Sequence, residues 1–239
     1  MPDLILDVEA VSSWDSLPEH ARATLLASHA RSESKLPLEA RGSPANDPRE
    51  SAALSPWTAR VVCVAIWDSA RKRGAVYHDG PKDRIDETDW SYHGMQSERG
   101  VLSAVWGYLG TQPEARVVSY NGRNYDGPVL MTRSVKHRVR PSRNLVPYRY
   151  STREHLDLCD CLTLWGVARS VSLDVVAGVL GIASSKGALS GAQVGQAYDE
   201  GRILDIARYC AADVEVTRAI LEVWEETVGQ VFNERKKWG

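Results

Sequence analysis

The sequence predicts an α/β protein built on one mixed β-sheet. Two observations lead to this class. Short runs rich in Val, Ile and Leu lie in the first half of the chain, and amphipathic segments of helical length lie between and after them. With 239 residues, of which 43% are hydrophobic and 25% charged, the composition is that of an ordinary globular protein. We expect a single domain over residues 1–239.

The elements follow in order along the chain. Alternating aliphatic residues predict strands, and 3.6-residue periodicity ended by glycine predicts helices. Residues 31–57 contain four prolines and few aliphatic residues, which predicts an irregular insertion. The predicted elements are a strand over 3–9, a helix over 16–30, a hairpin of strands 60–67 and 75–78, a helix over 97–109, a strand over 117–120, and helices over 128–135, 172–180 and about 202–231.

Several protein classes are disfavoured by what the sequence lacks. No apolar run approaches the ~18 residues of a membrane span, and the start resembles no secretory signal, so we expect a cytoplasmic protein without a membrane partner. The four cysteines are too scattered for a disulfide scaffold. His155, Cys159 and Cys161 suggest zinc only weakly, because no second Cys/His pair completes a closed site.

Two acids lie at the end of the first predicted strand. Asp7 and Glu9 are two residues apart, and strand residues i and i+2 point to the same face, about 6.6–7 Å apart along the chain. The pattern predicts two carboxylates side by side. A charged, exposed strand end is the alternative, because Asp-x-Glu is common by chance.

A third acid lies on the predicted closing helix. Tyr209 and Asp213 are four residues apart and therefore share a helix face, with Cβ atoms about 5–6 Å apart. The same face carries Ile206 and Ile220, so Asp213 is expected to point inward. A buried carboxylate needs a partner, which would be either a metal ion or a core arginine.

The fourth acid, Asp126, follows the stretch Tyr120-Asn121-Gly122-Arg123-Asn124-Tyr125. Asn121-Gly122 predicts a tight turn, which would place Asn121 and Tyr125 around the same opening. Because Gly127-Pro128 follows at once, Asp126 could instead serve as the N-cap of the next helix.

If the four acids converge, they predict a metal site. Two like charges about 4 Å apart repel by about 4 kcal/mol at an effective dielectric constant of about 20, so converging carboxylates keep protons or recruit cations. Oxygen ligands suit Mg²⁺ or Mn²⁺. Two such ions can stabilise the attacking and leaving oxygens of a phosphodiester, while Tyr209 orients the attacking water or takes its proton. The pattern indicates a metal-dependent nuclease.

A basic segment accompanies these acids. The net charge is −2, yet no acid occurs between Asp126 and Glu154. A local cationic stretch beside an acidic site would attract phosphate backbones, although a solvated basic loop is an equally simple explanation. The basic residues of this stretch are Arg133, Lys136, Arg138, Arg140, Arg143, Arg149 and Arg153.

In order, these motifs resemble those of the DEDD superfamily of 3′–5′ exonucleases, in its tyrosine-containing (DEDDy) branch. Asp7-Val8-Glu9 resembles the first motif, Asn121 through Asp126 the second, and Tyr209-x3-Asp213 the third. The linking stretches 155–158, 172–174 and 201–213 are similar to those of bacterial and phage exonucleases related to the proofreading domain of family-B DNA polymerases. The resemblance implies an RNase H-like fold with a mixed five-stranded sheet flanked by helices.

The resemblance also implies roles for individual residues. Asp7, Glu9, Asp126 and Asp213 would coordinate two divalent ions, and Tyr209 would position the water nucleophile. The backbone after Glu9, at Ala10 and Val11, would meet the 3′-terminal nucleotide, and Asn121 and Tyr125 would line its path. Apart from the resemblance, we expect Arg133 and Lys136 of the basic segment as further substrate contacts. Ala10 departs from the family, which often has threonine there, and Tyr120 and Tyr125 replace the usual phenylalanines.

The function expected from the sequence is therefore release of nucleoside monophosphates from single-stranded DNA ends. Two alternatives stay open. The same catalytic core could act on RNA, because discrimination depends on contacts to the 2′-hydroxyl that the sequence does not reveal. The chain could also be an inactive nucleic-acid-binding module that uses its basic segment. Protein partners are not predicted.

Overall fold

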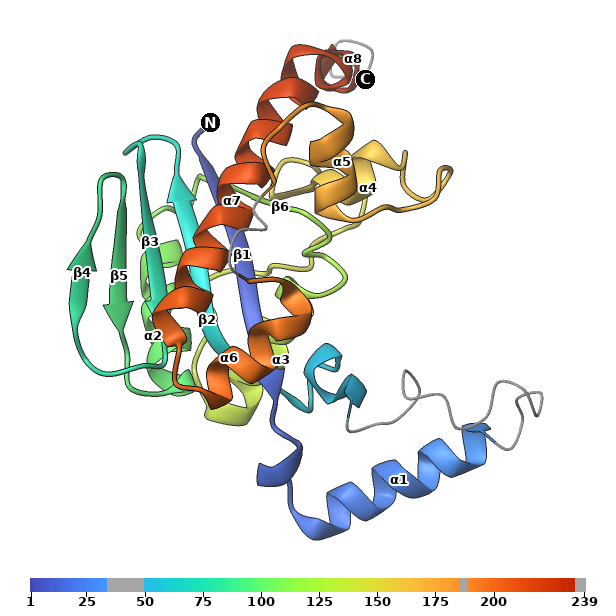
Figure 1. The fold of residues 1–239 in the computed structure, drawn as a ribbon. Coiled ribbons are helices and arrows are strands. Elements are labelled where there is room, and N and C mark those ends of the chain that lie inside the picture. Colours follow the sequence, from blue (N-terminus) through green and yellow to red (C-terminus); the bar gives the residue numbers. More distant parts are fainter. Residues whose placement is uncertain (34–49, 185–188, 235–239) are drawn as a thin grey trace.

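The computed structural model describes residues 1–33, 50–184 and 189–234. Its seven strands are β1 (Asp3–Ser12), β2 (Ala59–Asp68), β3 (Arg73–His78), β4 (Arg84–Asp86), β5 (Trp90–Gly94), β6 (Arg116–Ser119) and β7 (His155–Asp157). They form one sheet in the order β4-β5-β3-β2-β1-β6-β7 (Figure 1). β1 lies antiparallel to β2 and parallel to β6, so the sheet is mixed. The predicted α/β class is confirmed.

The sheet has seven strands where five were expected. The hairpin of β2 and β3 agrees with the prediction, whereas β4 and β5 extend the sheet beyond β3. The residue pattern misses β4, β5 and β7 for a simple reason. β4 and β7 have three residues each, and β5 reads Trp-Ser-Tyr-His-Gly, without an aliphatic run.

Helices cover both faces of the sheet. α7 crosses in front of β1 and β2, and α2 and α3 lie behind (Figure 1). The α-helices are α1 (Glu19–Glu33), α2 (Glu98–Gly110), α3 (Asp126–His137), α4 (Leu158–Leu162), α5 (Leu173–Val179), α6 (Val194–Asp199), α7 (Ile203–Glu226) and α8 (Val228–Glu234). Short 3₁₀ helices are η1 (Trp14–Ser16), η4 (Glu50–Leu54) and η5 (Gly191–Gln193).

Two helix predictions need correction. The expected closing helix over about 202–231 is two helices, because the backbone leaves helical geometry at Thr227 (φ −120°, ψ −102°) and α8 begins one residue later. The expected insertion over 31–57 falls largely outside the described residues, and its last part forms η4.

Side-chain alternation along β1 divides the core into two layers. Leu4, Leu6 and Val8 pack against α2 and α3, whereas Ile5 and Val11 join the layer under α7. Because strand side chains alternate between faces, Asp7 and Glu9 lie on the same face as Ile5 and point towards α7. The hydrophobic pattern that fixes the register of β1 therefore also fixes the direction of its carboxylates.

Candidate active site

Three carboxylates meet between β1 and α7. Ligand oxygens of Asp7, Glu9 and Asp213 all lie within 4.8 Å of one another, which is close enough to hold a metal ion. In the β1–β2 pair, Asp7 is opposite Ala65 and Glu9 is opposite Cys63. These small side chains leave room above the sheet for the carboxylates.

α7 supplies Asp213 and Tyr209 to this cluster. Asp213 is 8% exposed, so its predicted inward orientation is confirmed. Tyr209, one turn earlier, hydrogen-bonds Asp213, and burial together with the charges of Asp213 and Glu9 raises the pKa of its hydroxyl above the usual range. Without a cation nearby, Tyr209 therefore keeps its proton at neutral pH.

Asp126 is the first residue of α3 and is 5% exposed. The N-cap position belongs to Tyr125, whose side chain makes no capping hydrogen bond, so the expectation that Asp126 caps α3 is wrong. The carboxylate instead lies against Gly122: a Cβ there would come within 2.9 Å of Asp126 Oδ2 and even closer to Ser119 Oγ. Only glycine fits this close approach.

Burial and mutual repulsion raise the pKa values of the acids. Burial is the larger cause for Asp7 and the charge of Asp213 the second, and together they raise its pKa to about 7. The pKa values of Glu9 and Asp126 also lie well above their usual range, with burial first and the charge of Asp7 second. A bound divalent cation would favour the ionised forms and relieve this repulsion. The donor set fits a divalent metal.

A buried thiol also contacts the cluster. Cys210 Sγ donates to Asp7 Oδ2 at 3.3 Å, and Cys210 is fully buried. Burial, followed by a hydrogen bond with Cys63, raises the pKa of this thiol well above its usual range. Cys210 therefore acts as a neutral donor that fixes one oxygen of Asp7, a contact that sequence reasoning did not anticipate.

Asp157 fixes the loop that leads to Asp126. Its carboxylate accepts hydrogen bonds from the backbone nitrogens of Asn121 (2.8 Å) and Arg123 (2.9 Å). It also caps α4 through Cys159 N (3.0 Å) and Asp160 N (3.4 Å). The sequence signal was an aspartate directly before a helix start, but its reach across 34–36 residues was not predictable from local pattern.

Arg123 holds the same loop from its other side. Its buried guanidinium donates to the carbonyl oxygens of Pro147 (3.0 Å), Tyr148 (3.2 Å), Ser151 (2.6 Å) and His155 (2.6 Å). The segment 147–155 is thus fixed by one side chain. Arg123 was not among the predicted site residues.

The basic stretch proves to be partly structural. Arg133 is 1% exposed and forms a two-point ion pair with Glu98 (Nε–Oε1 2.6 Å, Nη2–Oε2 2.8 Å). The expectation that Arg133 contacts substrate is therefore corrected, because its guanidinium is occupied inside the core. Arg143 likewise donates to backbone carbonyls. Lys136 is exposed on α3, as a substrate contact requires.

The other predicted substrate contacts lie near the acids. Asn121 adopts a left-handed conformation (φ 63°), which agrees with the predicted turn, and Tyr125 donates its hydroxyl to Ala53 O at 2.8 Å, which ties the loop to η4. Ala10 follows a register shift in β1. Val11 lines a pocket of about 270 Å³ between the end of β1 and α6.

The zinc alternative is not supported. His155 is buried, and both its ring nitrogens are engaged, with Leu145 O at 2.8 Å and Ser119 Oγ at 2.7 Å. Burial lowers the pKa of His155 to about 4, so the ring is neutral. Within residues 1–33, 50–184 and 189–234, the carboxylate cluster is the one group of three or more side chains arranged to hold a metal.

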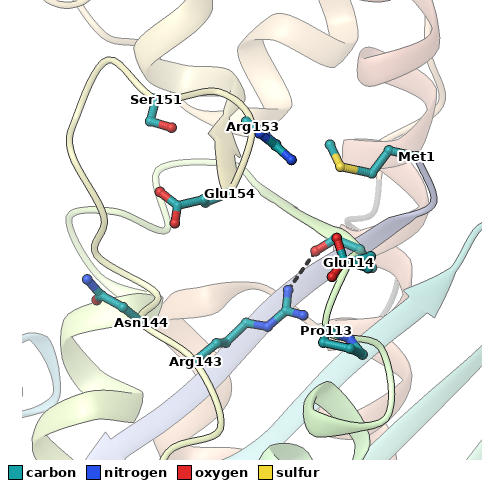
Figure 2. A pocket seen from close by; sticks show the side chains of 9 residues that line it. Met1, Pro113, Glu114, Arg143, Asn144, Ser151, Arg153 and Glu154 are labelled. Atoms are coloured by element: carbon teal, nitrogen blue, oxygen red, sulfur yellow. Dashed lines mark hydrogen bonds between the residues drawn. The ribbon is translucent and has the colours of Figure 1, made fainter.

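Another pocket lies apart from the acids. It measures about 470 Å³ and is lined by the chain start, the turn before β6 and the segment 143–154 (Figure 2). Its Arg143 is bound to Ala115 O at 2.7 Å. Pro113, Glu114 and Ala115 of this pocket precede β6, whereas the loop that leads to Asp126 follows the end of β6.

Comparison with known families agrees with this geometry. The model for predicted 3′-5′ exonucleases related to the exonuclease domain of PolB matches residues 83–231. The chain belongs to this family. The matched region contains Asp126, Tyr209 and Asp213, whereas Asp7 and Glu9 lie before it. Family membership indicates an exonuclease-like protein with a nucleic-acid substrate.

A solved structure shows the same fold. The family B DNA polymerase from the hyperthermophilic archaeon Pyrobaculum calidifontis aligns with a TM-score of 0.58 and 20% sequence identity, over 94% of this chain. The chain corresponds to 24% of the length of that polymerase. No curated protein matches the sequence. Among the described residues, no helix is long and apolar enough to cross a membrane.

Proposed function

We propose that this protein is a metal-dependent 3′–5′ exonuclease that releases nucleoside monophosphates from single-stranded DNA ends. The observation that carries the proposal is the convergence of Asp7, Glu9 and Asp213 within 4.8 Å, with Asp126 close enough to repel Asp7. Membership of the PolB-related family supports exonuclease chemistry. We further propose that residues 1–239 form one such domain and that it works in the cytoplasm.

The acids would hold two Mg²⁺ or Mn²⁺ ions. Asp7, Glu9, Asp126 and Asp213 offer only oxygen ligands, which these hard cations prefer. When bound, two such ions stabilise the charge on the attacking and leaving oxygens of a phosphodiester. Burial and the charge of Asp213 raise the pKa of Asp7 to about 7. This supports the assignment, because a bound cation would favour the ionised carboxylate.

Tyr209 would orient the attacking water. Its hydroxyl is hydrogen-bonded to Asp213 and has a raised pKa, so we assign it water positioning instead of proton removal. The water oxygen forms the new bond to phosphorus while the bond between phosphorus and the 3′-oxygen of the preceding nucleotide breaks. The departing 3′-oxygen takes up a proton, and a nucleoside 5′-monophosphate is released.

The substrate path would follow the predicted contacts. The backbone at Ala10 and Val11 would face the terminal nucleotide, next to the pocket that Val11 lines. Asn121, Tyr125 and Lys136 would border the DNA strand that precedes the terminal nucleotide. Alanine in place of the family's frequent threonine at position 10 removes one hydroxyl from this contact.

A cleavage time course tests the proposal. A 5′-labelled single-stranded DNA oligonucleotide and an RNA of matched sequence are incubated with Mg²⁺, Mn²⁺ or EDTA. The expected result is a ladder that shortens from the 3′ end, disappears in EDTA, and is at least 1,000-fold slower with Asp213→Asn, because one missing ligand disables the metal site. Asp86→Asn, on the exposed edge strand β4, is the matched control and should cleave normally.

Each other outcome selects a different function. Cleavage of RNA but not DNA would identify an exoribonuclease. Salt-sensitive binding without metal-dependent cleavage of either polymer would identify a nucleic-acid-binding module. Near-normal activity of Asp213→Asn would refute the metal role of that residue.

A further inference from the structure

Two exposed tyrosines end a ladder of aromatic rings. Tyr148 is 73% and Tyr150 58% exposed, and their ring centroids lie 5.5 Å apart with a 62° interplanar angle. Tyr150 packs against Trp165 at 6.0 Å, and Trp165 against Phe232 at 5.1 Å. These contacts hold the two outer rings in place, and both rings stay largely exposed to solvent. Large exposed aromatic surfaces of this kind commonly mark binding sites.

The chain segment that carries these rings passes beside the start of α3, where Asp126 lies. A Cβ on Gly127, the residue after Asp126, would come within 3.0 Å of Leu145 O and 3.1 Å of Val146 Cγ2. Tyr148 is only two residues beyond Val146, at most about 7.6 Å of chain. In addition, its carbonyl is held by Arg123 at 3.2 Å. The backbone of Tyr148 therefore lies within a few nucleotide lengths of Asp126.

The surroundings of the rings are cationic. Between residues 127 and 173 the acids are Glu154, Asp157 and Asp160, and the last two are buried. Arg149, Arg153 and Arg169 are exposed in the same stretch. Arg149 contacts the buried Asp160 at 2.6 Å, yet its side chain stays 53% exposed. A surface of this charge is complementary to a polyanion.

We propose that Tyr148 and Tyr150 are a stacking platform for the unpaired bases that precede the 3′ end. Every base has a π-face, so aromatic side chains beside cationic groups bind single strands without reading their sequence. Bases of a duplex are already stacked on each other and cannot use such rings. The inference rests on the proposed exonuclease function and assigns its substrate class: a single-stranded segment of several nucleotides, not merely a terminal one.

The platform also gives a reason for the hydrogen bonds by which Arg123 holds the segment 147–155. Four carbonyl oxygens of the segment 147–155 bind one guanidinium that lies in the loop leading to Asp126. A flexible loop would lose conformational entropy each time a base stacked on it. Fixing the segment in advance removes that cost and keeps the rings at a constant offset from the metal site.

Oligonucleotide length separates the platform from the catalytic site. Dissociation constants of 5′-fluorescein-labelled dT2, dT4, dT8 and dT12 are measured in EDTA by anisotropy, for the native protein and for Tyr148→Leu, Tyr150→Leu and both together. We expect the double variant to bind dT8 and dT12 about 5- to 100-fold more weakly, the range of one or two lost base stacks. The loss should shrink towards dT2, which is too short to reach the rings.

Control variants keep the test specific. Tyr148→Phe and Tyr150→Phe retain the π-face and should bind like the native protein, whereas leucine keeps apolar bulk without it. Val135→Ala removes another exposed apolar side chain, on α3, and should have no effect. Unchanged folding is checked by urea denaturation.

Two outcomes distinguish failure of the platform from failure of the proposed function. If the leucine variants bind and cleave dT12 as well as the native protein does, the platform is refuted and the exonuclease stands. If neither the native protein nor any variant cleaves, but binding of dT12 depends on the rings, the exonuclease proposal fails and the platform stands. Equal losses of affinity for dT2 and dT12 in the leucine variants would also overturn the platform, because the rings would then act at the 3′ end of the DNA.

Discussion

Replacing Asp157 should loosen the loop that carries Asp126. Oδ1 of Asp157 accepts from Asn121 N, Cys159 N and Asp160 N, whereas Oδ2 accepts from Arg123 N alone. In Asp157→Asn the carbonyl oxygen can keep the first three bonds, but the amide nitrogen then faces the Arg123 N–H. One buried donor is left without an acceptor, which costs about 1–3 kcal/mol.

The alanine variant should be affected more. Asp157→Ala removes the cap of α4, worth about 1 kcal/mol, and leaves the backbone donors of Asn121 and Arg123 unsatisfied at about 1–3 kcal/mol each. The expected destabilisation is therefore about 3–7 kcal/mol by urea denaturation in EDTA. Because misplacing a reacting group by about 1 Å can slow catalysis about 100-fold, we also expect weaker Mn²⁺ binding by calorimetry and a lower kcat.

A second capping residue supplies the control. Ser97 caps α2 by accepting from Gly100 N at 3.1 Å, so Ser97→Ala should lose about 1 kcal/mol of stability without any change in Mn²⁺ affinity. The reasoning is refuted if Asp157→Ala unfolds at the same urea concentration as the native protein. It is equally refuted if Asp157→Asn loses stability but binds Mn²⁺ and cleaves DNA normally, since Asp157 would then have no positioning role.

Three further predictions concern single side chains. The pKa of Asp7 rises from 3.8 to about 7 on folding, so the folded state retains a proton and the metal-free protein should lose stability as pH increases from about 4 to 7. Asp7→Asn should flatten this pH dependence and raise the Tm at pH 8 in EDTA. An unchanged pH dependence in Asp7→Asn would contradict this reasoning. Arg133→Met should cost about 3–5 kcal/mol, because buried Glu98 loses its guanidinium partner and keeps only His137 Nε2 and Val61 N. The salt dependence of DNA binding should stay the same, and a smaller salt slope would restore Arg133 as a phosphate contact. Tyr209→Phe should retain Mn²⁺ affinity and lower kcat more than it changes KM, whereas lost Mn²⁺ binding would indicate that the hydroxyl supports Asp213 instead of the water.

The sequence predicted those parts of the site that depend on local periodicity. The two-residue repeat of β1 correctly put Asp7 and Glu9 on one face, and the four-residue spacing on α7 correctly turned Asp213 inward. Both follow from the geometry of a strand or helix and need no tertiary information. The strand β7 was missed because three residues carry no periodicity, although its last residue, Asp157, fixes the active-site loop.

The basic segment shows the limit of arguments from composition. A count of positive residues cannot distinguish a solvated guanidinium from one buried against a carboxylate on a distant element. Arg133 forms an ion pair with Glu98, which lies on α2, and Arg143 donates hydrogen bonds to backbone carbonyl oxygens. Arginine suits this use because its planar fork satisfies several acceptors at once. Charge density near an acidic motif was therefore a poor guide to which cations remain free for substrate.

The four acids are held in two different ways, which bears on how the site takes up metal. Asp126 begins α3 directly after a loop whose backbone is fixed by Asp157 and Arg123, so its position does not depend on a cation. Asp7, Glu9 and Asp213 instead crowd together within 4.8 Å. Burial first, and the neighbouring carboxylates second, raise the pKa values of Asp7 and Glu9. Metal binding must displace the protons retained there. Affinity for divalent ions should therefore rise as pH increases through about 7, the pKa of Asp7, while the backbone around Asp126 stays in place.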